Sequence, residues 1–185
     1  MTGVRRGSDV YVRVLRPALD IGPGLARYVA PYPGVHLGHN ELTPGFSTLV
    51  ARLCLQASEP GGGITYCAAG TGDPGWDTSA PPAPTGEEVQ LASEIARKAF
   101  SAAYFVDSLG TPRTVDEAVS EQLNTIDFEV VFGVGEAVGS ICELGLWGGD
   151  ASAVLGSGTL VNYETIAAIP KPSQAELAFV FRFSF

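Results

Sequence analysis

"ELAFVFRFSF", residues Glu176–Phe185, ends the chain with an alternation that predicts a strand of a β-sheet. Residues two apart in a strand lie on the same face of the sheet. The apolar face of this strand would carry Leu177, Phe179, Phe181, Phe183 and Phe185. Burying one large apolar side chain contributes about 1.5–3 kcal/mol to stability. We therefore expect this face to lie in the core, and Phe185 to be a structural residue.

The same alternation recurs in shorter runs along the chain. Between residues 126 and 132, one face of the chain would carry Ile126, Phe128, Val130 and Phe132, and the other face Asp127, Glu129 and Val131. This alternation predicts a strand with one buried face. Further strand-like runs lie at residues 9–15, 64–72, 101–108, 139–147 and 154–169. The 185 residues include 23 glycines and 13 prolines with no collagen-like period. This pattern predicts a mainly β fold: an antiparallel β-sandwich-like domain with one or two short helices and an extended N-terminal arm.

Two segments have helical spacing. In residues 44–58, Thr43 is suited to cap a helix and Pro44 to its first turn, and the apolar residues that follow share one face. Glu87–Phe100 is the second candidate, because Leu91 and Ile95 lie four residues apart. Residues 1–38 are broken by proline and glycine without a lasting period. We expect residues 1–38 to form an extended docking arm, and residues 39–185 to form the antiparallel β domain with its helix near 44–58.

Residues 130–149, "VVFGVGEAVGSICELGLWGG", resemble the start of a dinucleotide-binding site. The spacing of Gly133, Gly135 and Gly139 is one residue off the commonest fingerprint, and no helical period follows Gly139. Without a helix N-terminus the segment offers no anion site of that type. We instead expect Gly133 and Gly135 to form a turn between antiparallel strands, with Gly139 as a bulge or close-approach position.

Glu143 lies between apolar neighbours in the strand expected after this turn. Two interpretations stay open: its carboxylate accepts hydrogen bonds from backbone N–H groups of a nearby loop, or it faces solvent. A lone acid without a second carboxylate in register is poor evidence for general acid–base catalysis.

Other candidate sites in the sequence are weak. His36 and His39 have H-x-x-H spacing, but Pro33 and Gly38 argue against the helix that would bring both rings to one metal. Asp73 and Asp77 resemble part of a calcium loop, yet the distal glutamate is missing, so turn and capping roles are favoured. No serine lies in a G-x-S-x-G motif. We expect no catalytic residue, no cofactor and no metal.

Trp76 and Trp147 both lie next to glycines. Two roles are open for each tryptophan: an exposed platform on which a sugar or a partner stacks, or a residue packed in the core or at an interface. We favour packing for both. The three cysteines have no CxxC spacing, which argues against a disulfide framework and a zinc site. Cys54 and Cys142 have apolar neighbours, so we expect them in the core.

The charge is unevenly distributed. The net charge is −9, which excludes the basic face that a duplex-binding protein needs, so no nucleic acid is expected. Residues 1–30 hold five arginines, including Arg5, Arg6, Arg13 and Arg16, against two aspartates, so the rest of the chain carries −12. A basic arm on an acidic body is suited to dock onto a neighbouring copy, or it is simply a solvated terminus. No apolar run reaches the roughly 20 residues of a membrane span, so we expect a soluble protein made in the cytoplasm.

From about Asn40 to Phe185, short motifs follow one another in a recognisable order. They are His39-Asn40 with Thr43 and Gly45, then Gly70-Thr71-Gly72, Glu94 with Arg97, Glu136, Gly139, Ile141, Glu143, Gly145-Leu146-Trp147, Lys171-Pro172 and the terminal Phe183-Ser184-Phe185. This order resembles tailed-bacteriophage structural proteins of the tail-fibre or tail-collar-like group. Each motif is short, and the order of the motifs carries the resemblance.

The resemblance implies a non-enzymatic virion component at the tail, the baseplate or the fibre attachment. Its partners would be other copies of itself, as a homo-oligomer, and other virion proteins, with no membrane. A capsid decoration or head-surface protein, a carbohydrate-binding receptor module, and a small hydrolase are the alternatives. The residues expected to shape the domain or its assembly contacts are Arg5, Arg6, Arg13, Arg16, Gly70, Gly72, Glu143, Trp147 and Phe185.

Overall fold

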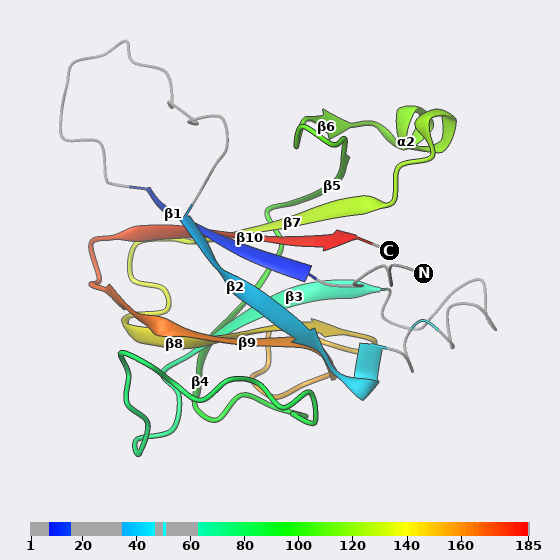
Figure 1. The fold of residues 1–185 in the computed structure, drawn as a ribbon. Helices are drawn as coiled ribbons and strands as arrows, with labels where there is room; N and C mark the ends of the chain where they lie inside the picture. The colour runs from blue at the N-terminus through cyan, green and yellow to red at the C-terminus, as the bar shows by residue number, and fades with distance from the viewer. Residues whose placement is uncertain (1–7, 16–34, 47–49, 51–62, 185) are drawn as a thin grey trace, which may run out of the picture.

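The computed structural model describes residues 8–15, 35–46, 50 and 63–184 (Figure 1). Within these ranges the chain is mainly β, with one complete helix, α2 (Val115–Glu121). The strands are β1 (Ser8–Leu15), β2 (Val35–Leu42), β3 (Ile64–Gly70), β4 (Glu94–Ala99), β5 (Ala102–Val106), β6 (Pro112–Arg113), β7 (Thr125–Phe132), β8 (Gly139–Gly148), β9 (Thr159–Lys171) and β10 (Glu176–Ser184).

The strands form two antiparallel sheets that face each other, as expected for a sandwich-like fold. The hydrogen-bonded order is β4-β3-β8-β9-β2-β1-β10-β7-β5-β6. We call β6-β5-β7-β10-β1 sheet I and β4-β3-β8-β9 sheet II. Strand β2 joins them, because its first part pairs with β1 and Glu41 and Leu42 pair with β9. Figure 1 shows β10, β1 and β7 of sheet I above β8, β9 and β3 of sheet II.

The C-terminal alternation places β10 inside sheet I, as the sequence predicts. Strand β10 pairs with β1 on one side and with β7 on the other. Its inward-facing side chains join those of both sheets in one core cluster; they are Leu177, Phe179, Phe181 and Phe183. Phe128 of β7 meets Phe183 edge-on, with ring centroids 5.7 Å apart. Phe185 lies outside the described residues.

The outward face of sheet I carries a buried ion pair that the alternation alone does not reveal. Asp127 of β7 lies directly opposite Arg182 of β10. Both carboxylate oxygens of Asp127 accept hydrogen bonds from the guanidinium group, each at 2.8 Å, and the Asp127 side chain is fully buried. A bidentate arginine–carboxylate pair of this kind fixes the register of two neighbouring strands. The expectation of a single buried face on β7 is therefore wrong at Asp127.

Two strands lie where the sequence predicts an arm. Strand β1 fits the expected strand at residues 9–15, but it pairs along its whole length with β10 in the middle of the sheet. Residues 35–38 begin β2, which pairs with β1. Residues 8–15 and 35–38 are thus part of the sheet and not of an arm beside it, because residues 8–15 pair with β10 and residues 35–38 pair with β1. Residues 1–7 and 16–34 of the expected arm lie outside the described residues.

The helices differ from the expectation in two places. Pro44–Phe46 and Val50 are helical, in agreement with the beginning of the helix expected at 44–58, and residues 47–49 and 51–58 are outside the description. Glu87–Phe100 contains no helix: residues 87–93 are irregular and Glu94–Ala99 form β4. A further helix, α2, lies in the polar stretch at 111–122, for which the sequence predicted no element.

The glycines at 133–139 connect the two sheets. Gly135 and Gly139 have positive φ angles of 78° and 148°, which favour glycine. Gly135 lies within the turn and Gly139 at its end. This turn links β7 of sheet I to β8 of sheet II, so it joins strands that do not pair with each other. The predicted turn is confirmed, but it crosses the sandwich and is not a hairpin. A strand follows Gly139, as the sequence predicts, and no helix N-terminus is formed there.

Candidate functional site

Residues 71–93, the connection between β3 and β4, form a long loop over the outward face of sheet II. We call this segment the cover loop; Figure 1 shows it below β8 and β9. A second, smaller core cluster lies between the cover loop and sheet II and contains Ala68, Leu91, Trp147, Leu160 and Tyr163. The loop is also hydrogen-bonded to β9, since Ala168 N–H donates to the Thr78 carbonyl at 2.8 Å and the Thr165 hydroxyl donates to the Pro82 carbonyl at 2.6 Å. Sheet II is therefore packed on both faces.

Glu143 holds the two ends of the cover loop together. Its Oε1 accepts hydrogen bonds from Gly72 N–H at 3.1 Å and Ser93 N–H at 2.7 Å. Its Oε2 accepts from Ala92 N–H at 2.9 Å and from the Tyr163 hydroxyl at 2.7 Å. The side chain is completely buried. Of the two interpretations of Glu143, the structure confirms the bond to a nearby loop and excludes the solvent-facing one.

Two glycines that the sequence analysis singled out make room for this carboxylate. Gly70 lies opposite Glu143 in the β3–β8 pairing. A Cβ at Gly70 would lie 2.3 Å from Glu143 Oε1 and 2.7 Å from the Ser93 carbonyl oxygen. Gly72 has a φ of +72°, and a Cβ there would lie 2.5 Å from the Trp76 ring. The structure thus brings Gly70, Gly72 and Glu143 into one cluster, as parts of a loop anchor.

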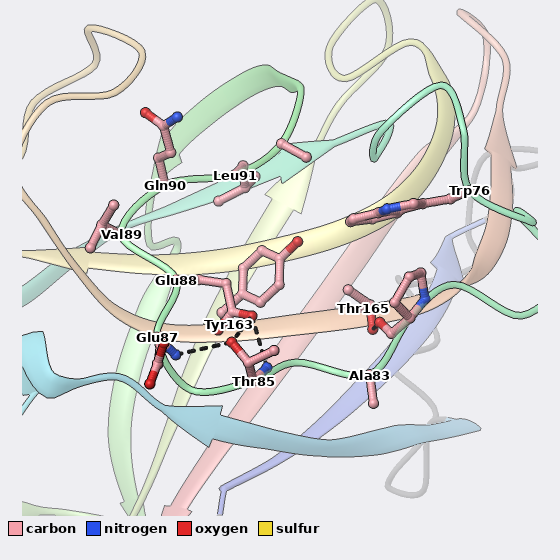
Figure 2. A pocket seen from close by; sticks show the side chains of 12 residues that line it. Trp76, Ala83, Thr85, Glu87, Glu88, Val89, Gln90, Leu91, Tyr163 and Thr165 are labelled. Carbon is pink, nitrogen blue, oxygen red and sulfur yellow. Dashed lines mark hydrogen bonds between the residues drawn. The ribbon is translucent and has the colours of Figure 1, made fainter.

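A cavity of about 450 Å³ lies between the cover loop and β9 (Figure 2). Its lining is largely apolar, with Trp76, Pro82, Val89 and Leu91 from the loop and the ring of Tyr163 from β9. In Figure 2, Trp76 stands at one end of the cavity and Val89 and Gln90 at the other, with Tyr163 between them. A volume of this size is in the range of small-ligand sites.

Glu88 supplies a carboxylate to this cavity. Its Oε1 accepts hydrogen bonds from the backbone N–H and the hydroxyl of Thr85, both at 2.8 Å, and its Oε2 accepts from Gly86 N–H at 2.9 Å. Partial burial opposes ionisation, but these hydrogen bonds outweigh it and lower the pKa of Glu88 below its ordinary value. Glu88 is therefore negatively charged at neutral pH.

The hydroxyl of Tyr163 stays protonated. Burial is the main cause that raises its pKa, and its hydrogen bond to Glu143 raises it further. This hydroxyl donates to the Glu143 carboxylate, so Tyr163 offers its ring, and not an acid or base, to the cavity. The arrangement presents an aromatic wall beside a negative charge.

Trp147 is buried, so its expected alternative role as an exposed stacking platform is wrong. The Arg97 guanidinium lies over its ring, 4.0 Å from the centroid. Arg97 also pairs with Glu94 at 2.6 Å and donates to the Ser157 carbonyl. Glu94 accepts from Gly156 N–H at 3.1 Å, so this cluster fixes the β8–β9 connection at residues 149–158. Trp76, in contrast, is half-buried and lines the cavity.

Lys171 is a structural residue that the sequence analysis recognised only as part of a short motif. Its buried ammonium group donates to the carbonyl oxygens of Gly133 and Ala175, each at 2.8 Å. It thereby ties the β7–β8 connection to the β9–β10 turn. Burial lowers the pKa of Lys171. A lysine next to a proline gave the only sequence signal for this role.

The remaining candidates lie in ordinary positions or outside the description. Asp73 and Asp77 each accept a backbone N–H two residues on, which confirms their turn roles. Cys142 is buried as predicted, and so is Cys67, whose pKa burial raises, while Cys54 lies outside the described residues. Arg5, Arg6 and Arg16 are also outside them; for Arg13, His36 and His39 the description is limited to backbone in β1 and β2. Tyr163, Glu88 and the backbone donors of residues 92 and 93 are site components that sequence reasoning missed.

No group of three or more His, Cys, Asp or Glu side chains suited to a metal ion occurs among the described residues. In the same part of the chain we find no helix with the length and apolar character of a membrane-spanning segment. No protein-family model matches the sequence. Nor does any curated protein match it closely enough to count as a relative.

Proposed function

We propose that this chain is a non-enzymatic structural component of a bacteriophage virion, placed at the tail, the baseplate or the fibre attachment. It assembles there through protein–protein interfaces with copies of itself and with other virion proteins. The order of short motifs from His39 to Phe185 first suggests this role. Two features of the described structure support it: the use of the buried polar residues, and the apolar side chains left exposed.

The buried polar residues serve the scaffold. Glu143 anchors the cover loop, Lys171 ties two connections together, and Arg97 holds the β8–β9 connection. Each of these charged groups is engaged with backbone atoms, which suits a subunit whose loops must keep a fixed shape. A fixed shape lowers the entropy lost when surfaces associate.

The single observation that carries the proposal is a group of exposed apolar residues at one end of sheet I. Leu109, in the β5–β6 turn, is 86% exposed, and Val115 and Val119 of α2 are 65% and 74% exposed. Figure 1 shows β6 and α2 together, beyond the body of the sandwich. Val115 and Val119 are four residues apart, so they lie on one face of the helix. Exposed apolar side chains on neighbouring elements are expected where a subunit is covered by a partner.

Analysis of purified particles tests the proposed function. We expect mass spectrometry to find the chain in purified virions, and immunogold labelling to place it at the tail. Labelling on the head would favour the capsid-decoration alternative. Absence of the chain from particles that carry every other structural protein would contradict the proposal.

Substitution of the exposed cluster tests the surface itself. Exchanging Leu109, Val115 and Val119 for serine removes apolar area that is already exposed, so the fold should be preserved. We expect the variant to be incorporated into particles less efficiently than the unaltered chain. The matched control exchanges Val154 and Leu155, which are exposed in the β8–β9 connection, for serine. Equal incorporation of both variants would show that the α2 surface is not an assembly contact.

A further inference from the structure

We propose that the cavity beneath the cover loop binds an organic cation: an ammonium or guanidinium group carried on an aliphatic body. This chemistry is shared by free small amines and by the lysine or arginine side chains of a neighbouring protein chain. The inference does not depend on the proposed function, because a cation of either origin would bind the isolated chain. It rests on the shape, the charge and the aromatic wall of the cavity.

The charge around the cavity selects against anions. Glu87 and Glu88 both line it, and no lysine, arginine or histidine does so among the described residues. Glu88 is half-buried, and the groups of Thr85 and Gly86 that donate hydrogen bonds to it are neutral. A carboxylate that is partly removed from water attracts a cation more strongly than a fully exposed one. The net charge of −9 acts in the same direction at longer range.

The aromatic wall suits the same ligand. Trp76 is half-buried and packs against Gly72, whose missing side chain lets the ring lie close to the backbone. The ring therefore has a fixed position at one end of the cavity (Figure 2). The face of a tryptophan attracts a cationic nitrogen by about 0.5–2 kcal/mol, depending on how far the pair is desolvated.

The rest of the lining suits an aliphatic body. Val89, Leu91 and Pro82 line the cavity together with Trp76 and Glu88, and the Tyr163 hydroxyl is occupied by Glu143. The Thr165 hydroxyl is likewise bonded to the Pro82 carbonyl at 2.6 Å. Two hydroxyl groups that could hold a neutral sugar are thus already engaged within the protein. An apolar chain that ends in a positive charge fits the lining better.

Nuclear magnetic resonance of ¹⁵N-labelled protein gives a direct test, because the chain has only two tryptophans. The indole N–H signal of Trp76 reports on the cavity, and that of buried Trp147 is an internal reference; a Trp76→Phe variant assigns them. The probes are choline and its neutral carbon isostere 3,3-dimethylbutanol, and N-acetyl-arginine amide with its neutral citrulline analogue. We expect a saturable shift of the Trp76 signal with a cation, weaker binding at high salt, and no shift with the neutral analogues.

The two cationic probes distinguish the sources of the ligand. Tighter binding of choline assigns the cavity to a free small cation, and tighter binding of the arginine amide assigns it to a basic side chain of a neighbouring chain. Either result supports the proposal. It is overturned if the neutral analogues bind as tightly as the cations, if a neutral sugar binds in their place, or if no cation shifts the Trp76 signal.

Variants show which groups are responsible. Glu88→Gln removes the charge and keeps the shape, and we expect it to weaken cation binding about tenfold. Asp116→Asn removes one negative charge from exposed α2 and should leave binding unchanged.

Trp76→Leu should abolish binding and Trp76→Phe should retain part of it, measured by saturation transfer to the methyl signals of choline. Unchanged affinity in Glu88→Gln, with the Trp76 signal of the free protein in its original position, would refute the role of the charge.

Discussion

At the scale of single residues, several glycines are required by what lies opposite them. Gly70 is the clearest case, because the space where its Cβ would stand is filled by Glu143 Oε1 and by the Ser93 carbonyl oxygen. Gly63, just before β3, has no heavy atom within 4 Å of the same position. The two glycines are seven residues apart in the chain and offer a matched comparison.

We expect Gly70→Ala to destabilise the fold by about 1–3 kcal/mol, the usual cost of forcing extra volume into a packed site. Gly63→Ala should change the free energy of unfolding little, because its site is open. Urea denaturation of both variants, followed by circular dichroism, measures the difference. Equal stability of the two variants would mean that the Glu143 side chain can move away at no cost.

The sequence indicated part of this cluster at the residue scale. A carboxylate bonded to a nearby loop was one of the two open interpretations of Glu143, and Gly70-Thr71-Gly72 stood out only as a turn and a short motif. Tyr163 and Ala92 are 20 and 51 residues away from Glu143 in the chain, and only the pairing of β8 with β9 and the course of the cover loop bring them near. No local pattern encodes such contacts.

At the scale of elements, the cover loop is held at its ends more than along its length. Thr71 N–H donates to the Ser93 carbonyl at 3.0 Å, next to the bonds that Glu143 accepts from both ends. Two bonds to β9, from Ala168 and Thr165, support its middle. Release of Glu143 should therefore open the loop without unfolding sheet I.

Glu143→Gln tests this separation. The amide keeps one acceptor oxygen, but its NH₂ group would face donors, so buried N–H groups lose partners at about 1–3 kcal/mol. We expect faster amide hydrogen exchange at residues 72, 92 and 93, and earlier proteolytic cleavage within residues 73–91. Amides of β10 and β7 should keep their protection. The control Asp116→Asn loses the same charge on exposed α2, and equal exchange in the two variants would contradict the anchoring role.

The elements were predictable where the pattern was long and regular. Strands β10 and β7 follow from alternation over ten and seven residues, respectively. The helix expected at Glu87–Phe100 rested on the spacing of Leu91 and Ile95 alone. In the structure Leu91 joins the cluster under the cover loop, and β4 pairs with β3, so tertiary packing overrides this weak periodicity.

Helix α2 shows the opposite error, because its local signal was present and was overlooked. The Thr114 hydroxyl oxygen accepts a hydrogen bond from Glu117 N–H, and the Glu117 carboxylate accepts one from Thr114 N–H, which is a capping box. The T-x-x-E spacing can be read in the sequence, but few apolar residues follow it. The helix buries only Ala118 among its residues, so its sequence carries no apolar face with helical spacing.

At the scale of the whole molecule, the N-terminal strands change the meaning of the expected arm. Strands β1 and β2 lie between β10 and β9, so they join the two sheets. A variant that lacks residues 1–38 would lose this junction, so a loss of assembly in that variant could come from a disrupted sheet and not from a missing docking arm. Composition gave the fold class correctly, but it could not show that the first strand pairs with the last one, since that contact spans nearly the full chain.

The acidic composition also determines how the whole fold responds to pH. Several carboxyl groups have pKa values below their ordinary ones, among them Asp77, Glu88, Asp107, Glu117 and Glu136. The unfolded state then binds more protons than the folded state in the acidic range. Their contribution to stability is complete above the ordinary pKa of about 4.3 for glutamate and is lost as pH falls through the folded values.

Glu136 allows this prediction to be tested in one pair. The side-chain hydrogen bond from Lys98 is the main cause that lowers its pKa, followed by the bond from Gly133 N–H, and the pair links β4 to the β7–β8 connection. We expect the free energy of unfolding to change little from pH 7 to pH 5 and to decrease below about pH 4.5.

Glu136→Gln and Lys98→Met should each reduce this acid-dependent loss, and the double variant should lose no more than Glu136→Gln alone. Urea titrations of the four proteins at neutral and acidic pH measure the cycle; additive effects of the two substitutions would show that Lys98 does not act through Glu136. Because the pair is partly exposed, high salt should reduce the difference between the unaltered chain and the variants.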